Sequence, residues 1–280
     1  MAKVAFLGTG LMGSAMVEAM LRRGDEVLAW NRTLERARPL EQLGARIALT
    51  AAEAVAGAER IHLLVSDDAA VDGILEQAGP GIGPGALVVD HSTVSPAGTV
   101  ARFKRCDQRG VEFLHAPVFM GPPQCREAAG LMLCAGPRPR VERAAPALKA
   151  MTGELWYVGE RVDLAASYKL FGNALLLVIV GGLADVYQLA ASLGIPASEA
   201  HAVFDHFKPA RGIDVRGKKM AVGDFTPSFE LVMARKDVRL MIEAASGSPL
   251  ALLPALAARM EQAIARGHGH EDVGVVASAT

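Results

Sequence analysis

A lysine inside an apolar segment is the first candidate for catalysis in this sequence. Lys169 lies in the run Leu164–Leu193, and Asn173 follows it four residues later. Residues four apart share one face of a helix, and burial of a lysine amine lowers its pKa toward neutrality. Such an amine donates a proton to a reacting atom and takes it back in the reverse reaction. The alternative is a lysine whose charge stays in water above an apolar stem, and for Lys169 taken alone this is the more common case.

Three further polar stretches could reach a ligand, because each follows a segment of strand composition. They are Leu64–Asp67, Asp90–Pro96 and Ala116–Gly121. In a doubly wound sheet, ligands bind outside the carboxyl ends of the strands. We therefore expect these three stretches to border one site.

The glycines near the start of the chain have an informative spacing. Val4–Leu7 has strand composition, and Gly8, Gly10 and Gly13 then form G-x-G-x-x-G. The first glycine permits a tight turn, the second lets the backbone approach a pyrophosphate, and the third lets helix and strand pack closely. An apolar-periodic run follows, and a second strand ends at Trp30, which is the context that dinucleotide binding requires. The residues of this turn that are expected to bind the cofactor are Gly8, Thr9, Gly10, Leu11, Met12 and Gly13.

The end of the second strand indicates which dinucleotide binds. In NAD enzymes an acidic residue there binds the ribose 2′-hydroxyl, but this chain has Asn31, Arg32 and Thr33. An arginine pairs with a 2′-phosphate, and the missing carboxylate removes a repulsion. The sequence therefore predicts NADP(H) in preference to NAD(H). The alternative is that Arg32 is only a solvated surface charge.

The order of strand and helix patterns predicts two domains. We expect an α/β Rossmann domain with a doubly wound, mainly parallel sheet at 1–161, followed by an all-helical domain for substrate binding and oligomerisation at 162–280. A long interdomain helix should join them, and the polar tail from Gly267 should be loose. The expected strands are Val4–Leu7, a strand ending at Trp30, Ile47–Leu49, Ile61–Val65, Ala86–Asp90, Val111–His115, Gly130–Ala135 and Leu155–Val158. The other expected helices include Leu34–Leu43, Ser198–Phe207, Pro227–Ala245 and Pro249–Arg266.

Composition excludes several classes of protein. Hydrophobic residues make up 51% of the 280 residues and charged residues 21%, so the chain can bury a core. A net charge of −1 argues against nucleic acid as a partner. Three cysteines without C-x-x-C spacing indicate reduced thiols and no metal site. The Leu170–Leu183 stretch is too short and interrupted for a membrane span. A strand beginning at residue 3 leaves no room for a signal peptide, so we expect a cytoplasmic protein.

Together these segments resemble the β-hydroxyacid dehydrogenase family, which includes 3-hydroxyisobutyrate dehydrogenase and the glyoxylate/succinic semialdehyde reductases. The resemblance covers essentially the whole chain. The family pattern G-x-G-x-M-G is met at residues 8–13, and D-x-S-T-x-x-P is met at Asp90–Pro96. K-x-x-x-N is met by Lys169 and Asn173, and a late K-D by Lys236 and Asp237.

The resemblance implies an NADP(H)-dependent oxidoreductase that interconverts a small aldehyde or keto acid with its hydroxy acid or alcohol. Lys169 would protonate the carbonyl oxygen as hydride arrives from the nicotinamide. Ser92 and Asn173 would contact the substrate. The residues that would lie near the nicotinamide and its ribose are Val65, Ser66, Thr93 and Lys236. By spacing alone, Lys236-Asp237 also fits a surface charge pair, and Ser92-Thr93 also fits loop capping.

The chain departs from the family at the substrate loop. The family's A-P-V-S-G-G binds a carboxylate through a serine hydroxyl and glycine amides. Here Ala116–Val118 is kept, but Phe119, Met120 and Gly121 replace the rest. These three residues are still expected to contact the substrate. Either other amides hold the carboxylate, or the substrate is more hydrophobic than a small hydroxy acid. His115, just before this loop, is interpreted as a structural histidine.

Two other functions stay open at this point. Imine reductases share this architecture but usually place Asp or Tyr at the lysine position, so Lys169 argues against that function while Phe119-Met120 weakly favours it. A non-catalytic NADP-binding module would explain the altered substrate loop, but it leaves Lys169 and Asn173 without a role.

The second domain also predicts an assembly. Apolar faces at Val178–Leu193 and Leu231–Ile242 predict a homodimer or homotetramer built on the helical domain, with a small molecule as the other partner.

Overall fold

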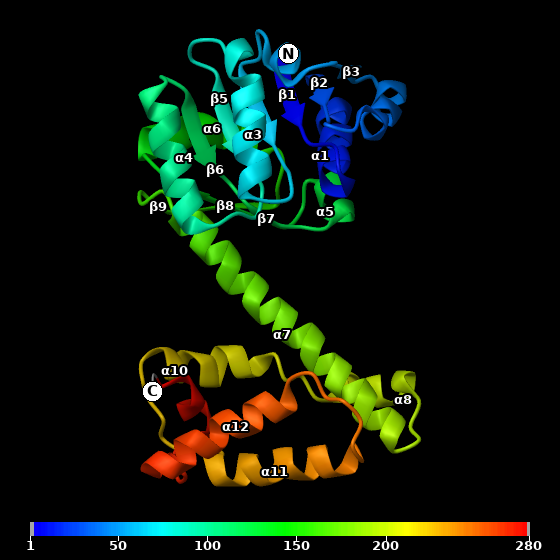
Figure 1. Cartoon of the computed structure of the whole chain (residues 1–280), viewed down its shortest axis with the longest axis vertical. Helices are drawn as coiled ribbons and strands as arrows, with labels where there is room; N and C mark the ends of the chain where they lie inside the picture. The colour runs from blue at the N-terminus through cyan, green and yellow to red at the C-terminus, as the bar shows by residue number, and fades with distance from the viewer. Residues whose placement is uncertain (1–2, 279–280) are drawn as a thin grey trace. The chain divides into compact units, whose positions relative to one another are not determined.

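The computed structural model describes residues 3–278 and contains two compact units (Figure 1). The first unit ends at Asn173 and the second begins at Ala174. This division lies inside helix α7 (Leu164–Ser192), later than the expected boundary at 161/162. The reason is that the start of α7 packs on the sheet, where Leu164 and Ala165 join a core cluster with Leu133.

The first unit is a doubly wound, mainly parallel sheet, which confirms the expected fold. The strands are β1 (Lys3–Leu7), β2 (Glu26–Trp30), β3 (Arg46–Ile47), β4 (Arg60–Leu63), β5 (Leu87–Asp90), β6 (Glu112–His115), β7 (Val118–Phe119), β8 (Leu131–Ala135) and β9 (Glu154–Gly159). Their order is β3-β2-β1-β4-β5-β6-β8-β7, and β9 pairs with β8. The pairs from β3 to β6 are parallel, whereas β8 runs antiparallel to β6 and β7.

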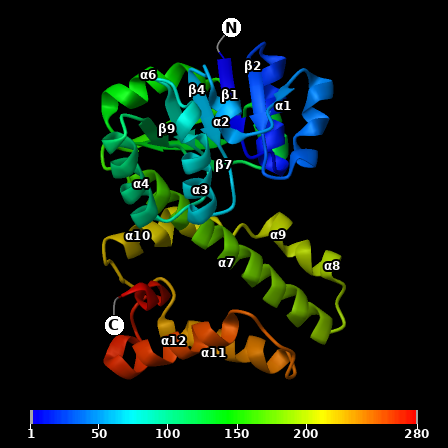
Figure 2. The same ribbon diagram turned by 45° about the horizontal axis from the view of Figure 1, so that its top comes forward.

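Helices cover both faces of this sheet (Figures 1 and 2). They are α1 (Leu11–Arg22), α2 (Ala51–Val55), α3 (Asp68–Ala78), α4 (Pro96–Gln108), α5 (Pro122–Glu127) and α6 (Arg138–Lys149), with short 3₁₀ turns η1 (Leu34–Arg36), η2 (Arg38–Leu43) and η3 (Gly79–Gly81). Side chains alternate along β1, so that Val4 and Phe6 enter one core cluster while Ala5 and Leu7 enter another. The strict alternation puts an apolar layer against each set of helices.

Several elements differ from the sequence expectations. The helix expected at Leu34–Leu43 is two 3₁₀ turns, because Pro39 cannot donate a backbone hydrogen bond and disfavours helical geometry at the residue before it. Strand β7 and helices α5 and α6 were not expected. The helix expected at Ser198–Phe207 is broken at Ala202.

The second unit is helical. Besides the rest of α7 it contains α8 (Ala197–His201), α9 (Val203–His206), η4 (Ile213–Gly217), α10 (Lys218–Ala221), α11 (Leu231–Ala244), α12 (Leu253–Ala263), η5 (Ile264–His268) and η6 (Val273–Ala277). Asp185 of α7 accepts hydrogen bonds from the backbone amides of Leu252 and Leu253, both at 2.9 Å, and also from Ala251. These bonds fix α7 to the start of α12.

The tail expected to be loose is ordered as far as residue 278. Asp272 is 4% exposed, and its carboxylate accepts hydrogen bonds from the amides of Gly274 and Ser228, both at 3.0 Å. Arg216 Nε also donates to it, at 2.8 Å. The expectation is wrong because polar composition does not by itself prevent order: this aspartate accepts hydrogen bonds from distant segments.

Helix α7 has the composition of a membrane span. It has 29 residues and a mean hydropathy of 1.9 in its most apolar window, so it is long and apolar enough to cross a bilayer. The sequence expectation applied to the shorter stretch Leu170–Leu183, which is too short for a membrane span, whereas the helix extends beyond it at both ends. Length and composition do not distinguish a membrane span from an apolar helix that packs on protein. The carboxylate of Asp185 in this helix accepts hydrogen bonds from the start of α12.

Candidate active site

The glycine turn after β1 has the geometry of a pyrophosphate cradle. Gly8 has φ 104°, and a Cβ there would stand 2.2 Å from the carbonyl oxygen of Leu64. A Cβ on Gly13 would stand 2.0 Å from the carbonyl oxygen of Gly8. Gly10 differs, because a Cβ there would meet no atom within 4 Å. Two glycines are therefore needed by the fold itself, and the third leaves open space in front of α1.

The start of α1 fits an anionic ligand. Gly10 is its N-cap and makes no side-chain cap, and the first turn contains no acidic residue. The free backbone N–H groups and the helix dipole there favour a phosphate. Leu11 is 84% exposed, and the buried Thr9 Oγ1 has no partner among residues 3–278. A bound dinucleotide would cover the exposed Leu11 side chain and could pair with the Thr9 hydroxyl.

The loop after β2 is tied to this turn by Asn31. Its Oδ1 accepts a hydrogen bond from the amide of Thr9 at 3.1 Å, and its Nδ2 donates to the carbonyl of Thr33 at 2.9 Å. The side-chain amide of Asn31 therefore makes its hydrogen bonds within the protein. Arg32 is exposed and makes no ion pair within the described part of the chain. Its guanidinium remains available to a ligand phosphate.

The loops after β4 and β5 are joined by Ser92. Its Oγ accepts a hydrogen bond from the amide of Val65, and its own amide donates to Asp90 Oδ1, both at 2.9 Å. Ser92 is fully buried, whereas Thr93 and Ser66 are exposed at the same edge of the sheet. The hydroxyl of Ser92 is therefore engaged in holding two loops together, and its contact with substrate stays a prediction.

Lys169 lies against Phe119, the last residue of the short strand β7. The residue is 9% exposed, and its Nζ stands 4.1 Å from the centre of the Phe119 ring. Among residues 3–278 this amine has no ion pair and no hydrogen bond. Burial lowers the pKa of Lys169 below its usual value. The lowered pKa eases release of the proton, and the amine faces a residue expected to contact the substrate.

Two glycines leave room for the bulky residues Phe119 and Met120. A Cβ on Gly172 of α7 would stand 2.4 Å from Phe119 Cζ, so the ring lies on the bare backbone of that helix turn. A Cβ on Gly130 would stand 2.9 Å from Met120 Cγ. Gly121 is the N-cap of α5, and its amide donates to Gln124 Oε1 at 2.6 Å. The replacement of small family residues by Phe119 and Met120 is therefore accommodated by the neighbouring backbone.

Asn173 and Lys236 are the remaining expected residues, and each has its own surroundings. Asn173 is half-buried on α7, and no hydrogen bond of its amide group occurs in the described residues. Lys236 lies on α11 in the second unit, where its Nζ pairs with Asp237 at 2.8 Å. Both side chains of that pair are more than one-third exposed. A contact of Lys236 with the cofactor stays a prediction.

Comparison with known proteins fixes the family. Residues 3–159 match the NAD-binding domain of 6-phosphogluconate dehydrogenase. The chain belongs to the β-hydroxyacid dehydrogenase family. Glyoxylate/succinic semialdehyde reductase 2 of Arabidopsis thaliana is 29% identical over 273 residues, which cover 96% of this chain and 76% of the relative. 3-Sulfolactaldehyde reductase of Escherichia coli is 28% identical over 279 residues, covering 97% and 93%.

Two further comparisons bear on function. Human cytokine-like nuclear factor N-PAC is 34% identical over 245 residues, which cover 86% of this chain but only 44% of that protein. The structure of Streptomyces aurantiacus imine reductase superposes with a TM-score of 0.88 and 26% identity, covering 98% of both chains. This β-hydroxyacid dehydrogenase family member is an NAD(P)-dependent reductase with an NAD(P)-binding domain.

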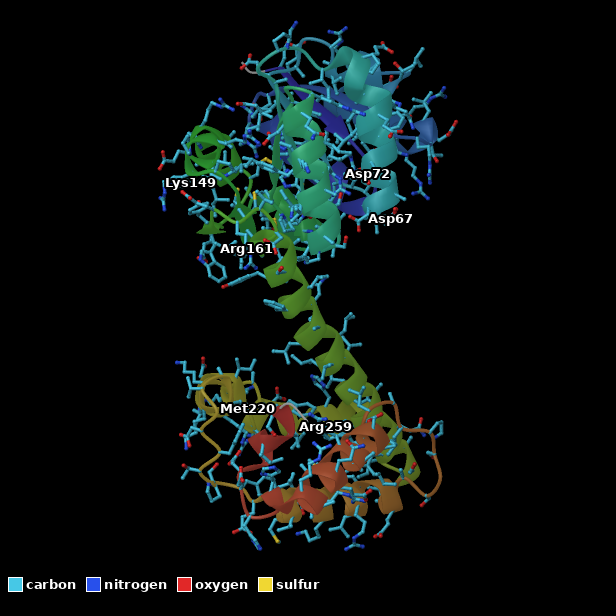
Figure 3. The ribbon with its side chains drawn as sticks, turned by 60° about the vertical axis from the view of Figure 1, so that its left-hand side comes forward. Asp67, Asp72, Lys149, Arg161, Met220 and Arg259 are labelled. Carbon is cyan, nitrogen blue, oxygen red and sulfur yellow. The ribbon has the colours of Figure 1, made fainter. Side chains whose placement is uncertain are left out.

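Sequence reasoning missed a network of ion pairs that joins α4 to α3 around one buried arginine. Arg102 of α4 is fully buried, and its guanidinium pairs with Asp72 at 2.7 Å and Asp68 at 3.1 Å. Both acids lie on α3, where Figure 3 labels Asp72. Their spacing of four residues, which puts two carboxylates on one helix face, was the signal available in the sequence. His62 and His91 were also missed, and both are fully buried in contact with each other.

The cysteines and acidic residues form no metal site in residues 3–278. No group of three or more histidine, cysteine, aspartate or glutamate side chains that could hold a metal occurs there. Cys106, Cys125 and Cys134 are buried free thiols. Burial raises the pKa of each thiol, so none has the activated character of a nucleophile.

Proposed function

We propose that this enzyme interconverts a small aldehyde or keto acid with its hydroxy acid or alcohol, with NADP(H) as cofactor and Lys169 as the proton donor and acceptor. The observation that carries the proposal is the environment of Lys169. Its Nζ is desolvated, lacks a carboxylate partner in the described chain, and lies 4.1 Å from the centre of the Phe119 ring at the end of β7.

The chemistry follows from the state of this amine. NADPH supplies a hydride to the carbonyl carbon when it is bound. The Lys169 ammonium donates its proton to the carbonyl oxygen, and the neutral amine removes that proton in the oxidation direction. Burial lowers the pKa of Lys169 and eases release of the proton. The Phe119 ring excludes water from one side and presents its negative face to the ammonium.

The preference for NADP(H) rests on the loop after β2. A second strand that ended in Asp or Glu would repel a 2′-phosphate, and this chain has no carboxylate at Asn31, Arg32 or Thr33. The internal hydrogen bonds of Asn31 leave Arg32 as the cation beside the open glycine turn. Its side chain would pair with the 2′-phosphate.

The substrate class is inferred from the loop and from the relatives. Glyoxylate, succinic semialdehyde and 3-sulfolactaldehyde, named in the relatives' activities, are aldehydes that carry an anionic group. We infer an aldehyde of this kind whose carbonyl lies at Lys169. Phe119 and Met120 supply no side-chain donor, and the Gly121 amide donates to Gln124, so other backbone amides of this segment would hold the anionic group.

A second candidate is reduction of imines. The apolar pair Phe119-Met120 favours it, and an imine reductase shares the fold. Lys169 is the observation against it, because the family chemistry of carbonyl reduction uses this lysine. A third candidate is a cofactor-binding module without turnover.

A substrate panel tests the proposal. Oxidation of NADPH is followed with glyoxylate, succinic semialdehyde, an apolar aldehyde and a cyclic imine, for the wild type and for Lys169→Ala. We expect turnover of aldehydes that Lys169→Ala abolishes. Lys149→Ala, at an exposed position at the end of α6 (Figure 3), is the matched control and should retain activity. Turnover of the imine alone, or tight NADPH binding with no turnover, contradicts the proposal in favour of the second or third candidate.

The exposed apolar residues of the second unit favour an assembly of copies of this chain. Leu177 of α7 is 68% exposed and Val180 is 57% exposed, which is a large apolar surface for one helix. We infer a homodimer or homotetramer that covers this face. Light scattering at micromolar concentration should give a mass of at least twice 29.4 kDa, and Leu177→Glu should reduce it. A monomer in the wild type contradicts the assembly.

A further inference from the structure

Two loops of the first unit exchange imidazole hydrogen bonds. His91 follows β5, and its Nδ1 lies 2.7 Å from the carbonyl oxygen of Ala116, which follows β6. His115 ends β6, and its Nε2 lies 2.9 Å from the carbonyl oxygen of Ser92, in the loop after β5. Each loop therefore sends one imidazole to the backbone of the other.

The direction of these bonds is fixed. A carbonyl oxygen only accepts, so His91 carries its proton on Nδ1 and His115 carries its proton on Nε2. Burial lowers the pKa of His91 to about 4 and also lowers the pKa of His115, so both rings are neutral near pH 7. The Nε2 of His91 then accepts from Nδ1 of His62, 2.9 Å away on β4. The ring planes of His62 and His91 differ by only 8°.

The bonds lie beneath the residues expected to do the chemistry. The first loop continues into Thr93, and the second continues into Phe119, whose ring covers Lys169. Backbone pairing links the two loops here through the amide of Ala116, which donates to the carbonyl of Asp90 at 2.7 Å. The two imidazoles add one link on each side of that bond, and all of them are buried.

We propose that His91 and His115 are positioning residues, which hold the loop Ser92–Thr93 at a fixed distance from the loop Val118–Gly121. This proposal rests on the proposed function, because it takes the first loop as the nicotinamide side and the second as the substrate side. A displacement of about 1 Å between reacting groups costs on the order of 100-fold in rate. Neither histidine touches the reacting atoms.

Matched substitutions separate this role from general packing. In His91→Asn the side-chain amide keeps a donor near the place of Nδ1, whereas His91→Leu removes it. In His115→Gln the amide keeps a donor near the place of Nε2, whereas His115→Leu removes it. Leu114→Ala, at a fully buried position on β6, controls for loss of stability without loss of either imidazole bond.

Hydrogen exchange of the whole protein is the first measurement. We expect His91→Leu to accelerate amide exchange at least tenfold in the segment 116–121, which is the opposite loop. We expect His115→Leu to do the same in 92–95. The Asn and Gln variants should restore most of the protection, and Leu114→Ala should lower the melting temperature without this reciprocal pattern. Exchange confined to the loop that carries the substitution, or equal behaviour of the Leu and amide variants, overturns the proposal.

Kinetics is the second measurement. kcat/KM for the aldehyde should fall at least tenfold in both Leu variants, while the Kd for NADPH changes less than threefold, because neither imidazole contacts the glycine turn or Arg32. The amide variants should recover to within threefold of the wild type. If the wild type turns over no aldehyde, the proposed function fails, and the exchange experiment still decides whether the two histidines position the loops.

Discussion

Arg32 allows the cofactor preference to be tested with a defined magnitude. The change is Arg32→Ala. The guanidinium is exposed, lies two residues after Trp30, and makes no ion pair in the described residues. The carboxamide beside it is already bonded to Thr9 and Thr33. Arg32 is therefore the side chain in this loop that can meet a 2′-phosphate with a full positive charge.

The size of the effect follows from exposure. Two unit charges 4 Å apart interact by about 1 kcal/mol in water and about 4 kcal/mol near a protein surface. An exposed arginine lies toward the lower part of this range, so about 1.4–2.7 kcal/mol is expected for the contact with the phosphate. This converts to a tenfold to roughly 100-fold weaker Kd for NADPH. NADH, which lacks the phosphate, should bind the variant as it binds the wild type.

Calorimetric titration with both dinucleotides measures the two constants. The exposed Arg36 in the following 3₁₀ turn provides the control, and Arg36→Ala should leave both unchanged. The advantage of NADPH over NADH should also shrink in 1 M salt, where the screening length falls to about 3 Å. If Arg32→Ala binds NADPH as tightly as the wild type does, or if both dinucleotides weaken equally, the assignment of Arg32 to the 2′-phosphate is wrong.

Further predictions concern the lysine, the glycines and the second unit. The rate of carbonyl reduction should fall with rising pH at a midpoint below the ordinary lysine pKa of about 10.4, since the ammonium is the reactive form, and a pH-independent rate up to pH 10 contradicts this. Gly172→Ala should displace the Phe119 ring and raise the KM for the aldehyde with little change in melting temperature, because the clash is with the end of a side chain. An unchanged KM would exclude a role for that ring. Gly10→Ala should fold normally but lose NADPH binding, whereas Gly13→Ala should cost about 1–3 kcal/mol of stability through its clash with the Gly8 backbone. Equal stability of the two variants would contradict the claim that Gly13 is packed against the backbone while Gly10 faces open space. Asp272→Asn should lower the free energy of unfolding of the second unit by about 1–3 kcal/mol, measured as a transition at lower denaturant concentration.

The pH dependence of Asp272 has a definite sign. Burial by itself would raise the pKa of this carboxyl, but hydrogen bonds from Gly274, Ser228 and Arg216 outweigh it and hold the pKa well below its usual range. A depressed native pKa stabilises the fold above the unfolded value of about 3.9 and loses this stabilisation as the pH falls below it. The wild type should therefore lose stability below pH 4 more steeply than Asp272→Asn. Parallel pH profiles for the two proteins would contradict this.

Features that depend on local geometry can be predicted from the order of residues alone. Gly8 must adopt a positive φ and Gly13 must lie against the turn, and both requirements belong to one short stretch of chain. The change from alternating strands and helices to helices alone predicted the Rossmann fold and its helical continuation, because periodicity reports which side of an element is buried. Lys169 was found in the same way, as a charge inside an apolar run.

Contacts between residues far apart in the chain depend on how the strands and helices pack. Phe119 covers Lys169 only because β8 pairs with β7 and the start of α7 packs on that part of the sheet. Neither residue's own sequence neighbourhood encodes a contact across fifty positions. The exchange of imidazole bonds between His91 and His115 likewise depends on the parallel register of β5 and β6, which places Asp90 beside His115. Local patterns specify elements, whereas the contacts that position the chemistry arise when strand register and helix packing bring their ends together.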